Sequence, residues 1–135
     1  MNLTSILNRK AIKLEISGRS KDEVIKEMVE NLAKTHNLSD PVLALRDVLA
    51  REAQMSTAIG TGIAVPHAKT EAVDKLIAGC GVCTEGADFG AEDGEPVRLV
   101  FMLLSPVDRS GPHVQALADI ARLVSQIDVR QILLD

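Results

Sequence analysis

The sequence contains no tryptophan, no tyrosine and only two phenylalanines. Proteins that bind single-stranded nucleic acid stack the bases on aromatic side chains and line the groove with positive charge. This chain instead intersperses 15 basic with 19 acidic residues, which gives a formal net charge of −4. We therefore predict no nucleic-acid partner.

Long apolar runs are also missing. The longest, "LVFMLL" and "GIAV", are far too short to span a membrane. The first residues, "MNLTSILNRKAIKLEI", have no basic leader followed by a long apolar stretch. We predict no signal peptide, no direct membrane insertion and a cytoplasmic location. With 135 residues, 46% of them apolar, the chain can fill the core of a single domain over residues 1–135.

Cysteine is scarce, and its two copies, Cys80 and Cys83, form a C-x-x-C motif. This spacing occurs in redox pairs and in zinc sites. Here the surrounding "LIAGCGVCT" is typical of a strand, in which residues three apart point to opposite faces. We interpret the pair as buried structural thiols.

Helical signals are clear in the first half of the chain. Ser20 and Glu23 form a capping box, and a helix is predicted from there to about Thr35, with a buried stripe of Val24, Ile25, Met28, Val29 and Leu32. His36 at its end is interpreted as a solvated residue that suits the helix dipole. Asp40 and Pro41 begin a second helix that ends near Arg51-Glu52. Its predicted buried stripe is Val42, Leu45, Val48 and Leu49.

Strands are predicted before, between and after these helices. "AIKLEI" (11–16) alternates in polarity, and further strands are expected at 63–65 and 76–84. The run 97–104, apolar except for Arg98, indicates a central strand buried on both faces. A third helix is expected to follow, with His113, Leu117, Ile120, Ala121 and Val124 on one stripe, and a fourth to start at Asp128. The pattern predicts an α/β fold, a mixed sheet flanked by helices.

His67 follows the short apolar stretch Ile63–Val65 and Pro66. Proline has a fixed φ and no N–H, and it forces the residue before it into extended geometry. We expect the strand to stop there and to leave His67 as a rigid, exposed imidazole in a loop at the edge of the sheet.

Two further residues fit an anion site. His113 follows Pro112 in the opening turn of the third helix, where free N–H groups attract anions. Arg51 precedes the His67 loop and offers a planar fork for phosphate oxygens. If these residues meet His67, the cluster suits a phosphoryl group better than a transition metal. Nearby positive charge would keep a histidine neutral, as a nucleophile must be, and would stabilise it once phosphorylated.

The stretch "STAIGTGIAVPHAK" resembles the active-site signature of enzyme IIA of the bacterial sugar phosphotransferase system, in the fructose/mannitol class that includes the nitrogen-related regulatory branch. The segments "ALRDVLAREAQMST", "ADFGAEDGEPVRLVFMLLSP" and "HVQALADIARLV" resemble the rest of that family in the same order. Members usually continue further, so the last helix is expected to be incomplete at Asp135.

The resemblance implies a phosphotransferase with a phosphohistidine intermediate. His67 would accept the phosphoryl group on Nε2 from HPr or a paralogue, with His113 and Arg51 as the other active-site residues. The recipient would be a cysteine of an enzyme IIB. No metal or organic cofactor is implied. A regulatory alternative, in which the phosphorylation state controls binding to a transporter or kinase, stays open. A remote alternative is a metal-dependent hydrolase that uses His67, His113 and Asp88 or Asp108.

Overall fold

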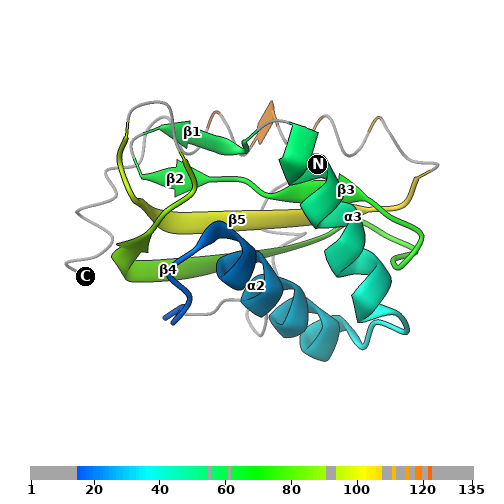
Figure 1. Cartoon of the computed structure of the whole chain (residues 1–135). Coiled ribbons are helices and arrows are strands. Elements are labelled where there is room, and N and C mark those ends of the chain that lie inside the picture. Colours follow the sequence, from blue (N-terminus) through cyan, green and yellow to red (C-terminus); the bar gives the residue numbers. More distant parts are fainter. Residues whose placement is uncertain are drawn as a thin grey trace.

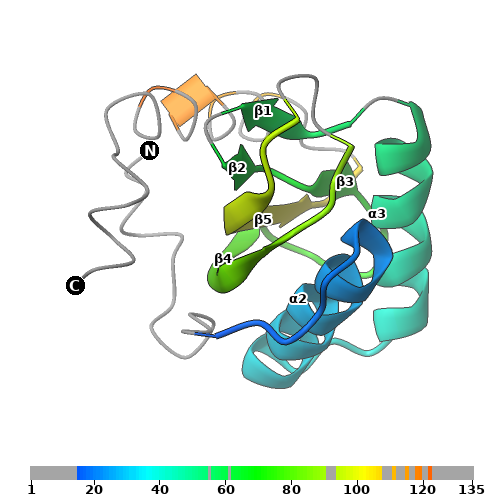
Figure 2. The same cartoon turned by 60° about the vertical axis from the view of Figure 1, so that its left-hand side comes forward.

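The computed structural model describes residues 15–54, 56–60, 62–90 and 94–107, and then Gly111, Gln115, Ala118, Asp119 and Arg122. Within this part of the chain, five strands form one mixed sheet. Helices α2 (Lys21–His36) and α3 (Pro41–Gln54) pack on one side of it (Figures 1 and 2). The predicted α/β fold, a mixed sheet flanked by helices, is confirmed.

Helix α2 spans Lys21–His36 and begins as predicted. The hydroxyl of Ser20 accepts the N–H of Glu23 at 3.3 Å and donates to the Glu23 carboxylate at 3.0 Å. Asn37 ends the helix in the left-handed conformation, with φ at 56°. All five residues of the predicted stripe are buried: Val24, Ile25, Met28, Val29 and Leu32.

Helix α3 spans Pro41–Gln54, and the Asp40 carboxylate accepts the N–H of Leu43 at 3.0 Å, so the predicted cap is confirmed. The predicted stripe is wrong at its first residue, because Val42 is 77% exposed. The buried residues are Ala44, Val48 and Glu52. Successive helical residues are rotated by about 100°. A face centred on Ala44 and Val48 therefore leaves Val42 pointing to solvent.

The sheet is built around β5, Val97–Ser105, which confirms the predicted central strand. One edge of β5 pairs in parallel with β2 and then β3, and the other pairs antiparallel with β4. The remaining strand, β1, pairs antiparallel with β2. The bounds are Ala58–Gly60 for β1, Ile63–Ala64 for β2, His67–Lys69 for β3 and Ile77–Ala87 for β4.

The two cysteines point to opposite faces of β4, as predicted. Cys80 lies opposite Phe101, whereas Cys83 belongs to the core shared with α2 and α3. Cys83 is buried, Cys80 only half-buried, and both are free thiols. Burial raises the pKa of each thiol to about 11, which keeps both protonated and unreactive near neutral pH.

The ends of the chain are described only in part. Of the predicted strand 11–16, residues 11–14 lie outside the described part. Ile16 is not in a strand, but it is fully buried and donates its N–H to the carbonyl of Val82 at 2.7 Å. His113, Asp108 and the predicted fourth helix also lie outside it. No helix in the described part is long and apolar enough to cross a membrane.

Candidate functional site

The backbone around His67 forms an interrupted strand. Gly62, with φ at 84°, makes the turn from β1, and its carbonyl accepts the N–H groups of Arg98 and Leu99 at 2.7 and 3.0 Å. From there the chain runs along β5 in one constant register, with Ile63 opposite Leu99 and His67 opposite Leu103.

The prediction that His67 lies in a loop is wrong, because it is the first residue of β3. Pro66 interrupts the strand but does not end the pairing. It has no N–H to donate, yet its carbonyl accepts the N–H of Leu103 at 3.0 Å. The His67 side chain is half-buried rather than exposed. Its backbone is therefore held by the sheet itself.

The His67 imidazole is oriented by the chain that leads into it. Its Nδ1 lies 2.8 Å from the carbonyl oxygen of Val65. A carbonyl can only accept, so Nδ1 carries the proton and donates. In the neutral ring the lone pair is then on Nε2. The contact therefore selects the tautomer whose nucleophilic atom is Nε2.

The pKa of His67 is lowered from its ordinary value of 6.5, mainly because burial disfavours the charged ring. The hydrogen bond to Val65 acts in the opposite direction. Among the described residues, the positive charge of Arg51 lowers this pKa and the negative charge of Glu52 raises it. The net effect is a ring that is neutral near pH 7, as a nitrogen nucleophile requires.

Arg51 and Glu52 come from the last turns of α3, which packs against β3. Arg51 is half-buried, and its charge acts on His67, so two of the three predicted site residues are brought together. The third, His113, lies outside the described residues. Lys69, at the end of β3, is exposed.

Glu52 is a site residue that the sequence reasoning missed. It is only 3% exposed, and its two carboxylate oxygens accept from the same residue, Thr57: the N–H at 2.9 Å and the hydroxyl at 2.6 Å. Thr57 in turn accepts the N–H of Val65 at its carbonyl, at 3.0 Å. A signal was present, because Glu52 lies four residues after the buried Val48 and so falls on the apolar face of α3.

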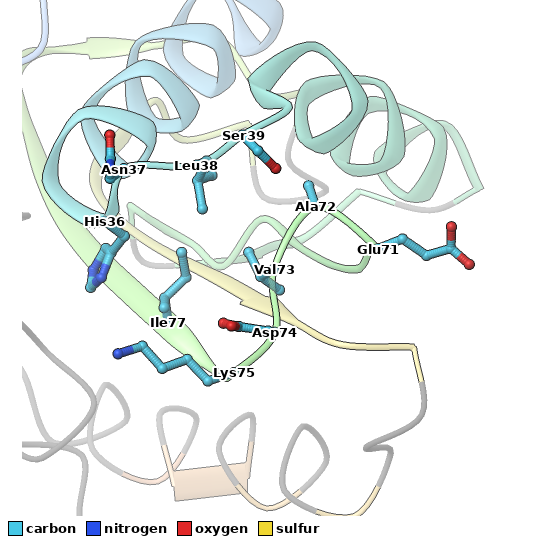
Figure 3. A pocket seen from close by; sticks show the side chains of 10 residues that line it. All are labelled: His36, Asn37, Leu38, Ser39, Glu71, Ala72, Val73, Asp74, Lys75 and Ile77. Carbon is cyan, nitrogen blue, oxygen red and sulfur yellow. The ribbon is translucent and has the colours of Figure 1, made fainter.

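His36 was predicted to be solvated, and this is wrong. Its Nε2 is buried and has no hydrogen-bond partner in the described part of the chain. It lines a pocket of about 290 Å³ between the end of α2 and the loop 71–75 (Figure 3). Burial lowers the pKa of His36, and the charge of Lys75 lowers it further. Residues 71–75 of this pocket come after the C-terminal end of β3, whereas His67 is the first residue of that strand.

Metal ligands do not cluster in the described residues: no three His, Cys, Asp or Glu side chains lie close enough to hold an ion. Asp88, one carboxylate of the hydrolase alternative, is exposed, and it accepts the N–H of Gly90 at 2.9 Å. What the described site offers is a neutral imidazole with a defined nucleophilic nitrogen, within reach of the charge of a guanidinium. Such a pair is suited to receive a phosphoryl group.

Comparison with known proteins agrees with this chemistry. The model of the family described as "Phosphoenolpyruvate-dependent sugar phosphotransferase system, EIIA 2" matches residues 5–135. The fructose-specific EIIABC component of Bacillus subtilis is 38% identical over the whole chain, which spans 21% of that protein. The fructose-specific EIIA component of Haloferax volcanii is 34% identical over 99% of the chain and 87% of its own length. A nitrogen regulatory protein of Bradyrhizobium diazoefficiens is 32% identical over 96% of the chain and 84% of its own length.

Solved structures give the same picture. Nitrogen regulatory protein IIA-Ntr from Neisseria meningitidis superposes with a TM-score of 0.86 at 31% identity, over 97% of this chain and 89% of that one. The complex of enzyme IIA-Mtl with phosphorylated enzyme IIB-Mtl from Escherichia coli matches with a TM-score of 0.73 at 26% identity, over 88% of this chain and 81% of the matched one.

Proposed function

Because the chain belongs to the EIIA 2 family of the phosphoenolpyruvate-dependent sugar phosphotransferase system, we propose that it is a phosphoryl carrier with His67 as the acceptor. The donor is HPr or a paralogue, itself phosphorylated on a histidine. The observation that carries this assignment is the contact between Nδ1 of His67 and the Val65 carbonyl, because it directs the lone pair to Nε2.

The transfer is a displacement at phosphorus. The Nε2 lone pair of His67 forms a bond to phosphorus while the phosphorus–nitrogen bond of the donor breaks, and that electron pair returns to the donor's imidazole. The proton on Nδ1 stays hydrogen-bonded to Val65 throughout. In the next transfer a cysteine thiolate of an enzyme IIB attacks phosphorus, and the electron pair returns to Nε2.

Arg51 and His113 serve as helpers in this proposal. The Arg51 guanidinium binds phosphoryl oxygens as a planar donor and neutralises their charge. The same positive charge disfavours protonation of His67 before transfer, so one group favours both the neutral nucleophile and the phosphorylated product. His113 contributes a second donor to the phosphoryl group.

A regulatory output of the same chemistry is the second candidate. It is favoured by the relatives named nitrogen regulatory proteins and by the overlap with IIA-Ntr. In that case the phosphohistidine controls binding to a transporter or kinase rather than feeding an enzyme IIB. Transfer from the phosphorylated protein to an isolated fructose-class IIB domain separates the two outputs, because only a carrier for sugar uptake loses its label rapidly.

The test of the acceptor is labelling with phosphorylated HPr. The wild type is expected to gain one acid-labile phosphoryl group, and His67→Ala none. His36→Ala is the matched control, since it removes another half-buried histidine and should still be labelled. Full labelling of His67→Ala would overturn the assignment. EDTA should leave labelling unchanged, whereas loss of activity with EDTA and recovery with zinc would favour the hydrolase.

A further inference from the structure

A chain of three contacts links the end of α3 to the His67 ring. The Glu52 carboxylate accepts from the N–H and the hydroxyl of Thr57. The Thr57 carbonyl accepts the N–H of Val65, and the Val65 carbonyl accepts Nδ1–H of His67. Every step is a hydrogen bond of 2.6 to 3.0 Å. Glu52 is therefore connected to the imidazole without touching it.

We propose that Glu52 is a positioning residue, which fixes the His67 imidazole relative to the Arg51 guanidinium through Thr57 and Val65. The inference rests on the phosphoryl transfer proposed for His67. The inference extends that proposed function, because it assigns a role to a carboxylate that would not itself contact the phosphoryl group.

The location of Glu52 supports this role. Arg51 is its immediate neighbour in α3, so whatever anchors Glu52 also anchors the backbone of Arg51. Thr57 lies just before β1, and its pairing with Val65 extends the β1–β2 ladder towards Pro66. The Glu52–Thr57 contact therefore joins the helix that carries the arginine to the β1–β2 ladder, which leads through Val65 to the histidine. Misplacing reacting groups by about 1 Å can slow an enzymatic step by about a hundredfold.

Burial makes this contact costly to omit. Glu52 and Thr57 are 3% and 6% exposed, so neither can exchange its partner for bulk water. A carboxylate placed on the apolar face of a helix needs such partners. An alanine or leucine at this position of α3 would need no hydrogen-bond partners, but it would leave the N–H and the hydroxyl of Thr57 without their acceptor.

Two substitutions separate position from charge. Thr57→Val removes one hydrogen bond and keeps the carboxylate, whereas Glu52→Gln keeps the size of the side chain and removes the charge. Thr57→Ser retains the hydroxyl and is the matched control. We expect Thr57→Val and Glu52→Gln to slow phosphoryl acceptance from phosphorylated HPr by about ten- to a hundredfold. Thr57→Ser should transfer at close to the wild-type rate.

Imidazole ¹⁵N shifts of the unphosphorylated protein supply a readout that a purely structural role would not move. The wild type should show His67 protonated at Nδ1, and Thr57→Val should show a mixture of tautomers. Glu52→Gln should also lower the protonation midpoint of His67, because it removes a negative charge that raises the pKa of this ring.

Wild-type rates and unchanged ¹⁵N shifts in both variants would overturn the proposal. The proposal would also be overturned if Thr57→Val lost phosphoryl transfer only in proportion to its loss of folded protein, as measured by urea unfolding, while its ¹⁵N shifts stayed normal. If instead the wild type takes no phosphoryl group, the proposed function fails, and the ¹⁵N shifts still decide whether Glu52 positions the ring.

Discussion

The carbonyl oxygen of Val65 lies 2.8 Å from Nδ1 of His67, only two residues further along the chain. The residue between them, Pro66, has a fixed φ, so the backbone that holds the acceptor and the ring has little freedom. The same Pro66 accepts a hydrogen bond from Leu103 of the central strand. The "AVPH" sequence therefore sets both the position of the imidazole on the sheet and the tautomer that it adopts.

The first prediction concerns the pH dependence of His67. Its pKa is below the ordinary 6.5, so the neutral nucleophile should persist at pH values where a free histidine is already protonated. NMR titration of the ring protons measures the pKa directly, with His67→Ala to assign the resonance. Arg51→Gln should raise this pKa, because it removes a positive charge that lowers it. A wild-type value at or above 6.5 would contradict the prediction.

The second prediction concerns Arg51 as a helper. Charge-assisted contacts to phosphate contribute about 1.5–3 kcal/mol each. Arg51→Ala should therefore slow phosphoryl acceptance by about ten- to a hundredfold. Arg51→Lys keeps the charge but not the planar fork, so it should recover the rate only in part. The rates are measured with phosphorylated HPr, and urea midpoints are measured alongside. If the urea midpoints of these variants fell sharply while the rate of phosphoryl acceptance per folded molecule stayed normal, Arg51 would be a structural residue.

Local signals predicted α2 and the central strand correctly. The capping pair at Ser20 and Glu23 and the regular apolar stripe involve residues close together in the sequence, so they can be recognised without knowing a distant partner. Residues 99–104 of this strand are apolar on both faces, and only a central position in the sheet buries both.

Long-range pairing explains what the sequence could not indicate. Pro66 indicates a strand end because it lacks an N–H. Its carbonyl nevertheless accepts a hydrogen bond from Leu103 of β5, and the pairing with β5 resumes at His67. Glu52 looked like the polar end of a helix, because its partner Thr57 lies beyond the end of α3. His36 looked solvated, because the loop 71–75 that lines the same pocket is distant in sequence. In each case the partner comes from another element.

The third prediction concerns packing between α2 and β4. A Cβ added to Gly81 would lie 2.7 Å from the sulfur of Met28 and would clash with Cδ1 of Ile16, and both of these side chains are fully buried. Gly81→Ala should therefore lower the free energy of unfolding by about 1–3 kcal/mol. At Gly111 an added Cβ meets nothing within 4 Å in the described structure. Gly111→Ala is the control and should not lower the free energy of unfolding, because Gly111 is helical and alanine is a better helix former than glycine. Equal urea midpoints for the two variants would show that the core can absorb the methyl group.

The last prediction concerns His36 and Lys75, which line the same pocket (Figure 3). The pKa of His36 is lowered from 6.5 by burial and then by the charge of Lys75. The folded state therefore binds this proton less tightly than the unfolded state does. The free energy of unfolding should fall as the pH drops from about 6.5 towards the folded pKa, and should be independent of this group above that window.

Lys75→Gln removes the nearby charge, so it should raise the pKa of His36 and make the acid loss of stability shallower. Lys75→Arg keeps the charge and should leave both unchanged. The pKa is followed by NMR, with His36→Gln to assign the resonance, and stability by urea unfolding between pH 5 and 8. His67 also has a lowered pKa and contributes to the same slope, so the comparison is made within a His67→Ala background. If Lys75→Gln and Lys75→Arg give the same His36 pKa, the lysine charge does not reach the ring, and burial alone lowers its pKa.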